Sequence, residues 1–217
     1  YRAALRDFDR ATQIDPDFSS ALLCRGAMHQ TIGNLDEALL DLAKALEREP
    51  DLAEAHASYG MARQLRGGRL ADAGKWDEAI REWDAAVAEQ DKAVELRPGL
   101  AYSYTARASS RVSRAAWLDR SGRAAEARRE RDDAVRDCGL AIDRSPSFAG
   151  AFMNRGIVLD ALGNHSAAIE DHTRAVDLDS GSAPARFNRG RSYDGSGDIE
   201  LARLKARNHL SAGEARK

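Results

Sequence analysis

The side chains that could bind a metal ion or act as a nucleophile are few in this sequence, with five histidines and two cysteines. His165 and His172 are seven residues apart, so they can share one face of a helix and could hold a metal ion between them. Neither cysteine has a histidine at zinc-site spacing. No glycine-rich phosphate loop or nucleophile elbow of the required form occurs. We therefore expect no catalytic residue, no metal site and no cofactor.

The two cysteines, Cys24 and Cys138, lie far apart in the sequence, each within a segment predicted to be a packed helix. A free cysteine in such a place behaves as a small apolar side chain. We therefore predict two buried thiols rather than a disulfide.

Arginine and aspartate recur at a fixed spacing. Asp41 follows Arg25 by 16 residues, and Asp171 follows Arg155 by the same distance. On two facing helices, the guanidinium fork of arginine can hold a carboxylate through two hydrogen bonds. We predict partly buried pairs Arg25–Asp41 and Arg155–Asp171; the alternative is that the arginines line a groove and bind an acidic ligand. The arginine column continues with Arg107 and Arg189.

The elements that must position these residues are short amphipathic helices. Residues 149–180 have the apolar spacing of two helices joined by a turn at Gly163-Asn164. Residues 19–52 repeat this pattern with a turn at Gly33-Asn34. Small residues such as Gly156 allow two helix backbones to approach closely. One such hairpin cannot bury its apolar face alone, so it requires neighbours of the same shape.

This pattern resembles the tetratricopeptide repeat family, whose unit is 34 residues long. The resemblance covers nearly the whole chain. It implies an all-α, right-handed α-solenoid of stacked antiparallel helix hairpins, with about five and a half units and eleven helices in a single array over residues 1–217. The expected units are a half repeat at 1–16, then 19–52, 53–98, 101–146, 149–180 and a capping repeat at 183–213.

The third and fourth units are longer than the family unit. Pro98 follows Pro50 by 48 residues, and Pro146 follows Pro98 by another 48, in place of 34. The surplus divides into seven residues per helix, which is about two helical turns. Since seven residues restore nearly the same helix face, we interpret these units as elongated hairpins rather than as inserted loops. Gly67-Gly68 is expected to weaken the first long helix and can kink it.

All three tryptophans, Trp76, Trp83 and Trp117, fall within the two elongated units. The favoured interpretation is that they fill the additional core between the long helices. The alternative is an accessory exposed patch containing Trp83 and Trp117, which would bind a partner or a second copy.

Composition and charge exclude some classes of function. The formal net charge is −2 with 31% charged residues, which argues against a general nucleic-acid-binding protein. No apolar run approaches the roughly 20 residues of a membrane span, and no signal peptide is visible. The sequence begins within a predicted helix, so we expect a fragment of a longer, cytoplasmic protein whose targeting signals are not visible.

In the family that this sequence resembles, the first helix of each unit lines a concave groove that binds peptides or partner helices. Asn154 and Asn188 match the asparagine that holds the ligand backbone there. The lysines that clamp a C-terminal carboxylate are absent, so a chaperone tail is not an expected ligand. The resemblance implies these groove residues: Gln30, Gln64, Tyr102, Asn154, Ile157, Asp160, Asn188, Arg191 and Asp194.

We therefore predict a non-catalytic protein–protein interaction scaffold that binds a peptide or protein segment in this groove. One alternative is a homo-oligomerisation module, such as a homodimer, formed through the elongated hairpins. Another is the regulatory or scaffolding region of a larger bacterial enzyme, such as a serine/threonine kinase. The sequence does not identify the partner.

Overall fold

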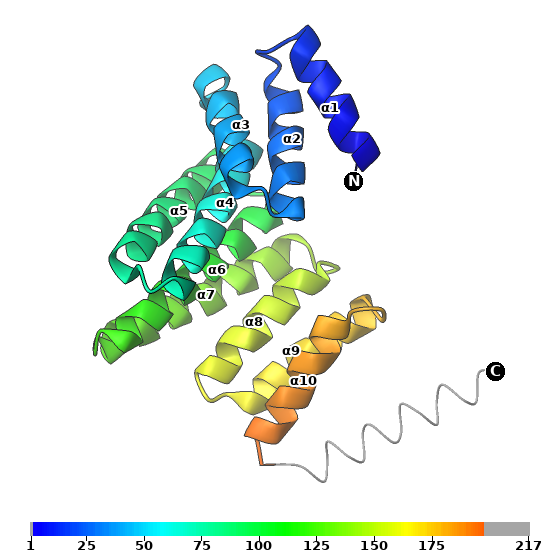
Figure 1. Cartoon of the computed structure of the whole chain (residues 1–217). Coiled ribbons are helices and arrows are strands. Elements are labelled where there is room, and N and C mark those ends of the chain that lie inside the picture. Colours follow the sequence, from blue (N-terminus) through cyan, green and yellow to red (C-terminus); the bar gives the residue numbers. More distant parts are fainter. Residues whose placement is uncertain (1, 198–217) are drawn as a thin grey trace, which may run out of the picture. The chain divides into compact units, whose positions relative to one another are not determined.

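The computed structural model describes residues 2–197, which form ten α-helices and no strand (Figure 1). The predicted all-α fold is confirmed, and the expected eleventh helix, in the second half of the 183–213 repeat, lies outside the described residues. The helices are α1 (Arg2–Ile14), α2 (Ser19–Ile32), α3 (Leu35–Arg48), α4 (Ala53–Asp72), α5 (Trp76–Leu96), α6 (Ala101–Arg120), α7 (Ala124–Arg144), α8 (Ala149–Ala161), α9 (His165–Leu178) and α10 (Ala183–Gly195).

The chain divides into two compact units, Tyr1–Arg144 and Ser145–Lys217. In the first unit, α2 pairs with α3, α4 with α5 and α6 with α7, while α1 packs on α2. In the second unit, α8 pairs with α9, and α10 packs on both. A single array over the whole chain stays a prediction.

Each hairpin turns at a glycine whose backbone has a positive φ. The φ angle is +86° at Gly33 and +80° at Gly163, a left-handed conformation that side chains other than glycine rarely adopt. These are the two turns expected from the repeated Gly-Asn pair. The ends of the helices are therefore set by the backbone conformation that glycine allows as well as by the spacing of apolar residues.

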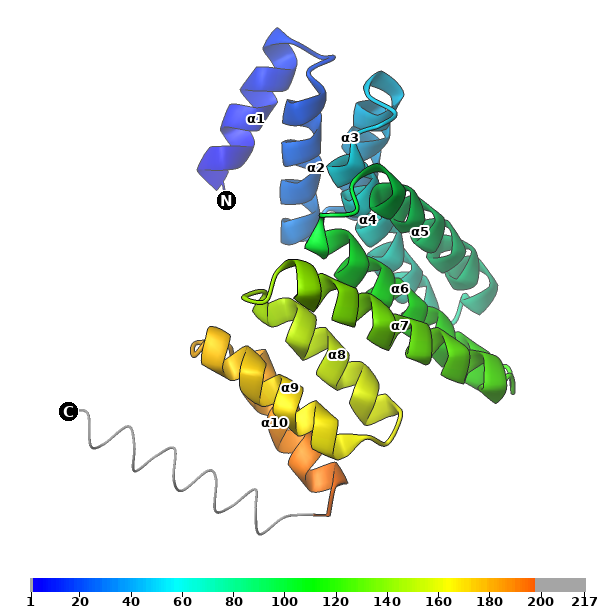
Figure 2. The same cartoon turned by 180° about the vertical axis from the view of Figure 1, so that it is seen from behind.

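The two long hairpins are continuous paired helices. Helices α4 and α6 have 20 residues each, and α5 and α7 have 21, against 14 for α2 and α3. Figure 2 shows the α4–α5 and α6–α7 hairpins side by side, in agreement with the packing of α6 on both α4 and α5. The predicted elongation is therefore confirmed, and α4 runs without a break through Gly67-Gly68.

Gly67 has a packing role that its sequence position did not reveal. A Cβ atom at Gly67 would lie 2.5 Å from Nε1 of Trp83, so only glycine leaves room for this indole. The indole N–H donates to the backbone carbonyl oxygen of Gln64 at 3.1 Å, and Trp76 packs against the ring edge-to-face with 6.5 Å between centroids. Trp83 is only 3% exposed. Its assignment to an exposed accessory patch is therefore wrong, since Trp83 fills the core between α4 and α5.

One of the two cysteine predictions is also wrong. Cys138 is buried, whereas Cys24 is exposed, and the two cysteines do not form a disulfide. Leu22 and Gly26 form the buried face of α2. Cys24 is two residues from each of them, which is a rotation of about 200° around the helix. It therefore points away from the core.

The predicted arginine–aspartate pairs are confirmed. Arg25 donates to both carboxylate oxygens of Asp41 at 2.6 Å, and Arg155 donates to both oxygens of Asp171 at 2.7 Å. The hydrogen bonds and the negative charge of Asp41 raise the pKa of Arg25. The two carboxylates are buried, at 3% and 5% exposure, so the pairs lie inside the hairpins.

The elongated α6–α7 hairpin keeps the same pair with a longer sequence spacing. Arg107 donates to Asp137 at 2.9 and 2.5 Å, 30 residues away instead of 16. Arg107 is the seventh residue of α6, as Arg25 is of α2. Asp137 lies seven residues before the end of α7, as Asp41 does in α3. All 14 additional residues therefore lie on the turn side of the pair.

Some of these arginines also bind the hairpin that comes before them. Arg25 contacts Asp9 of α1 at 3.2 Å, and Arg107 contacts Asp91 of α5 at 2.8 Å. Nearer the turn, Arg114 lies 3.2 Å from Asp84 of α5 and 3.5 Å from Glu130 of α7. One arginine of α2 or α6 therefore joins three helices.

The ion pair predicts a large cost for removing one partner. Arg25→Met leaves the buried Asp41 carboxylate without a counter-charge, so we expect a loss of about 3 kcal/mol in the free energy of unfolding, measured by urea denaturation. Arg136→Ala breaks an exposed pair with Asp133 and should leave stability almost unchanged. Equal effects of the two changes would show that the inner pair does not stabilise the fold.

Gly67 and Gly68 provide a matched test of the tryptophan contact. Gly67→Ala forces the added methyl group against Trp83, and we expect a loss of about 1–3 kcal/mol. A Cβ at Gly68 meets no atom within 4 Å, so Gly68→Ala should stabilise the helix by up to about 1 kcal/mol. Urea denaturation followed by tryptophan fluorescence measures both changes. Stabilisation by Gly67→Ala would contradict the packing role.

Candidate functional site

A pocket of about 410 Å³ opens between α8 and α10 in the second unit. Five of the predicted groove residues meet there, from positions 157 to 194 of the sequence. The lining residues are Ile157, Asp160 and Ala161 of α8, His165 of α9, and Asn188, Arg191, Asp194 and Gly195 of α10. We name this site the α8–α10 pocket.

Helical spacing explains why these side chains converge. On α8, residues 157, 160 and 161 are three and four positions apart, so they share one face. The α10 residues 188, 191 and 195 follow the same rule. Gly195 allows the ring of His165 to approach, because a Cβ there would lie 2.8 Å from the ring. The pocket therefore follows from two helix faces and one small residue.

Asp160 is the centre of a polar network in this pocket. His165 Nδ1 lies 3.0 Å from Asp160 Oδ1. The hydroxyl oxygen of Ser192 lies 2.5 Å from Asp160 Oδ2 and 3.0 Å from the carbonyl oxygen of Asn188, so two acceptors share its single proton. The predicted groove residues include Asp160 but neither His165 nor Ser192. Ser192 is buried, and nothing in the sequence around this polar residue indicates its burial.

His172 lies behind this network, completely buried. Its ring fills the space above Gly156, where a Cβ would lie 2.6 Å from the imidazole. Nε2 is 3.6 Å from Asp160 Oδ2, and neither ring nitrogen makes a hydrogen bond within the described residues. Burial lowers the pKa of His172, although the nearby Asp160 charge opposes the change. His172 therefore occupies the core as a neutral ring.

Several groups around the pocket are available to a ligand. The side chains of Asn188, Arg191 and Asp194 make no hydrogen bond or ion pair with other described residues. Ile157 is 40% exposed, and Phe187, which precedes Arg191 by one turn on α10, is 67% exposed. The pocket thus combines polar side chains that have no partner among the described residues with the exposed apolar side chain of Ile157.

A second pocket, also of about 410 Å³, lies between α2 and α4 in the first unit. Its lining contains the predicted Gln30 and Gln64, which are 34 residues apart, as are Asp160 and Asp194. Fewer of its groups are available, because Gln64 Nε2 donates to Ser113 Oγ at 3.0 Å and Arg69 donates to the Gly33 carbonyl at 2.7 Å. We name it the α2–α4 pocket.

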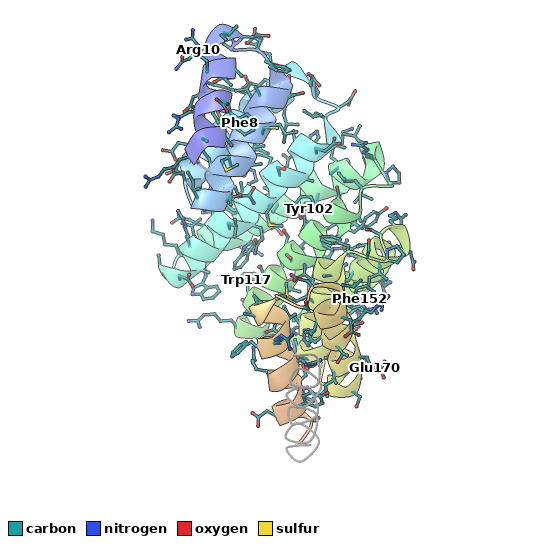
Figure 3. The ribbon with its side chains drawn as sticks, turned by 90° about the vertical axis from the view of Figure 1, so that its right-hand side faces the viewer. Phe8, Arg10, Tyr102, Trp117, Phe152 and Glu170 are labelled. Atoms are coloured by element: carbon teal, nitrogen blue, oxygen red, sulfur yellow. The ribbon has the colours of Figure 1, made fainter. Side chains whose placement is uncertain are left out.

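The remaining predicted residues lie outside both pockets. Asn154 is partly buried on α8. Tyr102 on α6 is 36% exposed, and desolvation raises the pKa of its hydroxyl. Trp117 lines a smaller cavity of about 230 Å³ between α5, α6 and α7, where the Arg123 guanidinium lies 5.6 Å from its ring centroid. Figure 3 marks Tyr102 and Trp117 on the first unit.

Within residues 2–197, no group of three or more histidine, cysteine or acidic side chains is arranged to hold a metal ion. In the same part of the chain, no helix is long and apolar enough to cross a membrane.

The helices pair into antiparallel hairpins, and pockets lie between the first helices of neighbouring hairpins. This arrangement is typical of helical repeat proteins. The family model of the tetratricopeptide repeat matches residues 120–183. A solved tetratricopeptide repeat protein from Thermus thermophilus has a TM-score of 0.70 and 19% identity, over 89% of this chain and 90% of that one. The family model confirms the predicted resemblance over residues 120–183, and the solved structure has the same fold.

Two further solved structures have the same fold. PilW, a type IV pilus biogenesis factor, has a TM-score of 0.66 and 19% identity, over 100% of this chain and 87% of that chain. A tetratricopeptide repeat protein from Parabacteroides merdae has a TM-score of 0.65 and 17% identity, over 97% and 71% of the two chains. Proteins with this fold are in general protein–protein interaction scaffolds, and they are typically not enzymes.

The buried His172 predicts a pH-dependent stability. Its pKa is lower in the folded chain than the ordinary value of about 6.5 in the unfolded chain. The unfolded state therefore binds more protons, and stability falls as the pH decreases below about 6.5 towards the folded-state pKa. The variant His172→Leu has leucine at this position, as the 19–52 unit has at Leu42. Its free energy of unfolding should not fall in this pH range as that of the wild type does. Urea denaturation between pH 7.5 and 5 compares the two, and parallel stability curves would exclude the effect.

Proposed function

We propose that the chain is a non-catalytic scaffold whose α8–α10 pocket binds an extended peptide segment of a protein partner. The observation that supports this proposal is the combination of exposed Ile157 with the side chains of Asn188, Arg191 and Asp194, which have no partner within residues 2–197. In a folded protein, polar side chains that converge on a pocket with apolar walls are typical of a binding site.

Each of these groups matches a feature of an extended peptide. The Asn188 amide has donors and an acceptor, as has a peptide backbone. Ile157 and Phe187 offer apolar surface whose burial favours association. Arg191 and Asp194 offer charges of opposite sign, which select the side chains of the ligand and its direction. The groups come from two rigid helices, so binding requires little ordering of the receptor.

The α2–α4 pocket is the weaker candidate, because Gln64 and Arg69 already bind other groups of the first unit. Self-association through the elongated hairpins, membership of a larger enzyme and a cytoplasmic location stay predictions. Trp117 stays a predicted residue of an accessory binding patch, whereas Trp83 is excluded from it because Trp83 is buried.

Peptide display tests the proposal. Random 12-residue peptides selected on the full chain should bind in fluorescence anisotropy, and the double variant Ile157→Ala/Asn188→Ala should bind them at least tenfold more weakly, a loss of about 1.4 kcal/mol. Glu170→Ala, at an exposed position of α9 outside the pocket, is the control and should bind as the wild type does. Equal affinity for the double variant and the control would place the peptide elsewhere and reject the proposal.

A further inference from the structure

The buried carboxylates of this chain have arginine as their partner. This holds for side chains in both units, with N–O distances of 2.5 to 3.5 Å. Removal of a carboxylate from water is costly unless an opposite charge compensates it. The buried carboxylates that follow this rule are Asp41, Asp137 and Asp171, and the half-buried Glu82 and Glu130 have arginine partners as well.

Asp160 does not follow this rule. Its side chain is 23% exposed, and its ion-pair partners within the described residues are the two histidines, His165 and His172. Burial lowers the pKa of His172 and so disfavours its charged form, and Ser192 contributes a hydroxyl rather than a charge. Glu89 also has a histidine partner, His56, but it lies outside both pockets. Asp160 is thus a half-buried negative charge at the wall of a cavity, and no arginine within residues 2–197 forms an ion pair with it.

A second carboxylate lies on the α10 side of the same cavity. Asp194 is exposed and makes no ion pair with other described residues. At the equivalent positions of the α2–α4 pocket, the chain has the neutral amides Gln30 and Gln64. The two pockets therefore share their place in the repeat and differ in charge.

The sum of charges in the α8–α10 pocket is negative. Arg191 is the one arginine of the lining, and it is exposed, so its side chain can extend into solvent. Among the aspartate and arginine side chains of the lining, two carboxylates outweigh one guanidinium. Ile157 and Ala161 add apolar surface next to the carboxylates. A long side chain with a methylene stem and a positive end fits such a site, because the stem covers apolar atoms and the charge meets the carboxylates.

We propose that the α8–α10 pocket binds a lysine or arginine side chain of the bound segment, with Asp160 and Asp194 as the receptor carboxylates. This inference rests on the proposed function and names the chemistry of its ligand. The basic side chain supplies Asp160 with the counter-charge that arginines supply to the other buried carboxylates of the chain.

The test uses small probes, so it does not depend on a known partner. The ¹⁵N-labelled chain is titrated with Nα-acetyl-lysine N-methylamide, and the shifts of the backbone amides of Asp160, Ala161 and Gly195 are followed by NMR. The norleucine derivative has nearly the same stem without the charge, and the glutamate derivative has the opposite charge. We expect saturable shifts with lysine, at least tenfold weaker binding of norleucine and no shift with glutamate.

Two variants assign the effect to the carboxylates. Asp194→Gln introduces the residue that the α2–α4 pocket has at Gln64, and since Asp194 is exposed, the fold should remain intact. Asp160→Asn removes the charge but keeps an oxygen that accepts from Ser192. Each should weaken lysine binding at least fivefold. Asp177→Asn, which removes an exposed charge of α9 outside the pocket, should have no effect.

Two results would overturn the inference: equal binding of lysine and norleucine, or equal effects of Asp194→Gln and Asp177→Asn. If the displayed peptides still lost affinity for Ile157→Ala/Asn188→Ala, the peptide groove would stand and only the basic ligand would be rejected. If both experiments failed, the pocket would not be the binding site.

Discussion

The arginine–carboxylate bridge is the interaction on which the hairpins of this protein depend. Alanine and glycine dominate the contacts between helices, as at Ala38, Ala45, Ala168 and Ala175, which are at most 1% exposed. Such small side chains bring helices close but specify register poorly. A bidentate pair such as Arg25–Asp41 has one geometry and a high cost when broken. It therefore fixes how far one helix can slide along its partner.

The α4–α5 hairpin shows what happens where this arginine is missing. Tyr59 takes the place of Arg25, as the seventh residue of its helix. Glu89, at the place of Asp41, turns to His56 instead, with 2.7 Å between Nδ1 and the carboxylate. The His56 Nε2 in turn lies 2.8 Å from the carbonyl oxygen of Pro50. A histidine thus takes the position of the arginine as the polar partner from the first helix, without the permanent charge of a guanidinium.

Much of the fold could be predicted because its signals are periodic. The 48-residue proline spacing gave the long helices, and the 16-residue arginine–aspartate spacing gave the inner pairs. The groove residues Asp160 and Asn188 followed from the family resemblance, which fixes helix faces. Side-chain burial within a face was harder. Trp83 became a core residue because Gly67, on another helix, makes room for it, and no local pattern at either residue reveals that contact.

The position of the Arg107–Asp137 pair has a consequence for how such hairpins change length during evolution. Both residues are anchored near the open end, and the additional residues all lie beyond them towards the turn. If both helices of a hairpin gain seven residues, the turn end becomes longer and the half that contains the arginine–aspartate pair keeps its packing. A heptad gained by one arm alone would leave seven residues without a partner opposite. Insertions should therefore occur in both helices together, by equal numbers of residues and at the turn end of the hairpin. We expect related proteins to differ in length mainly at this end.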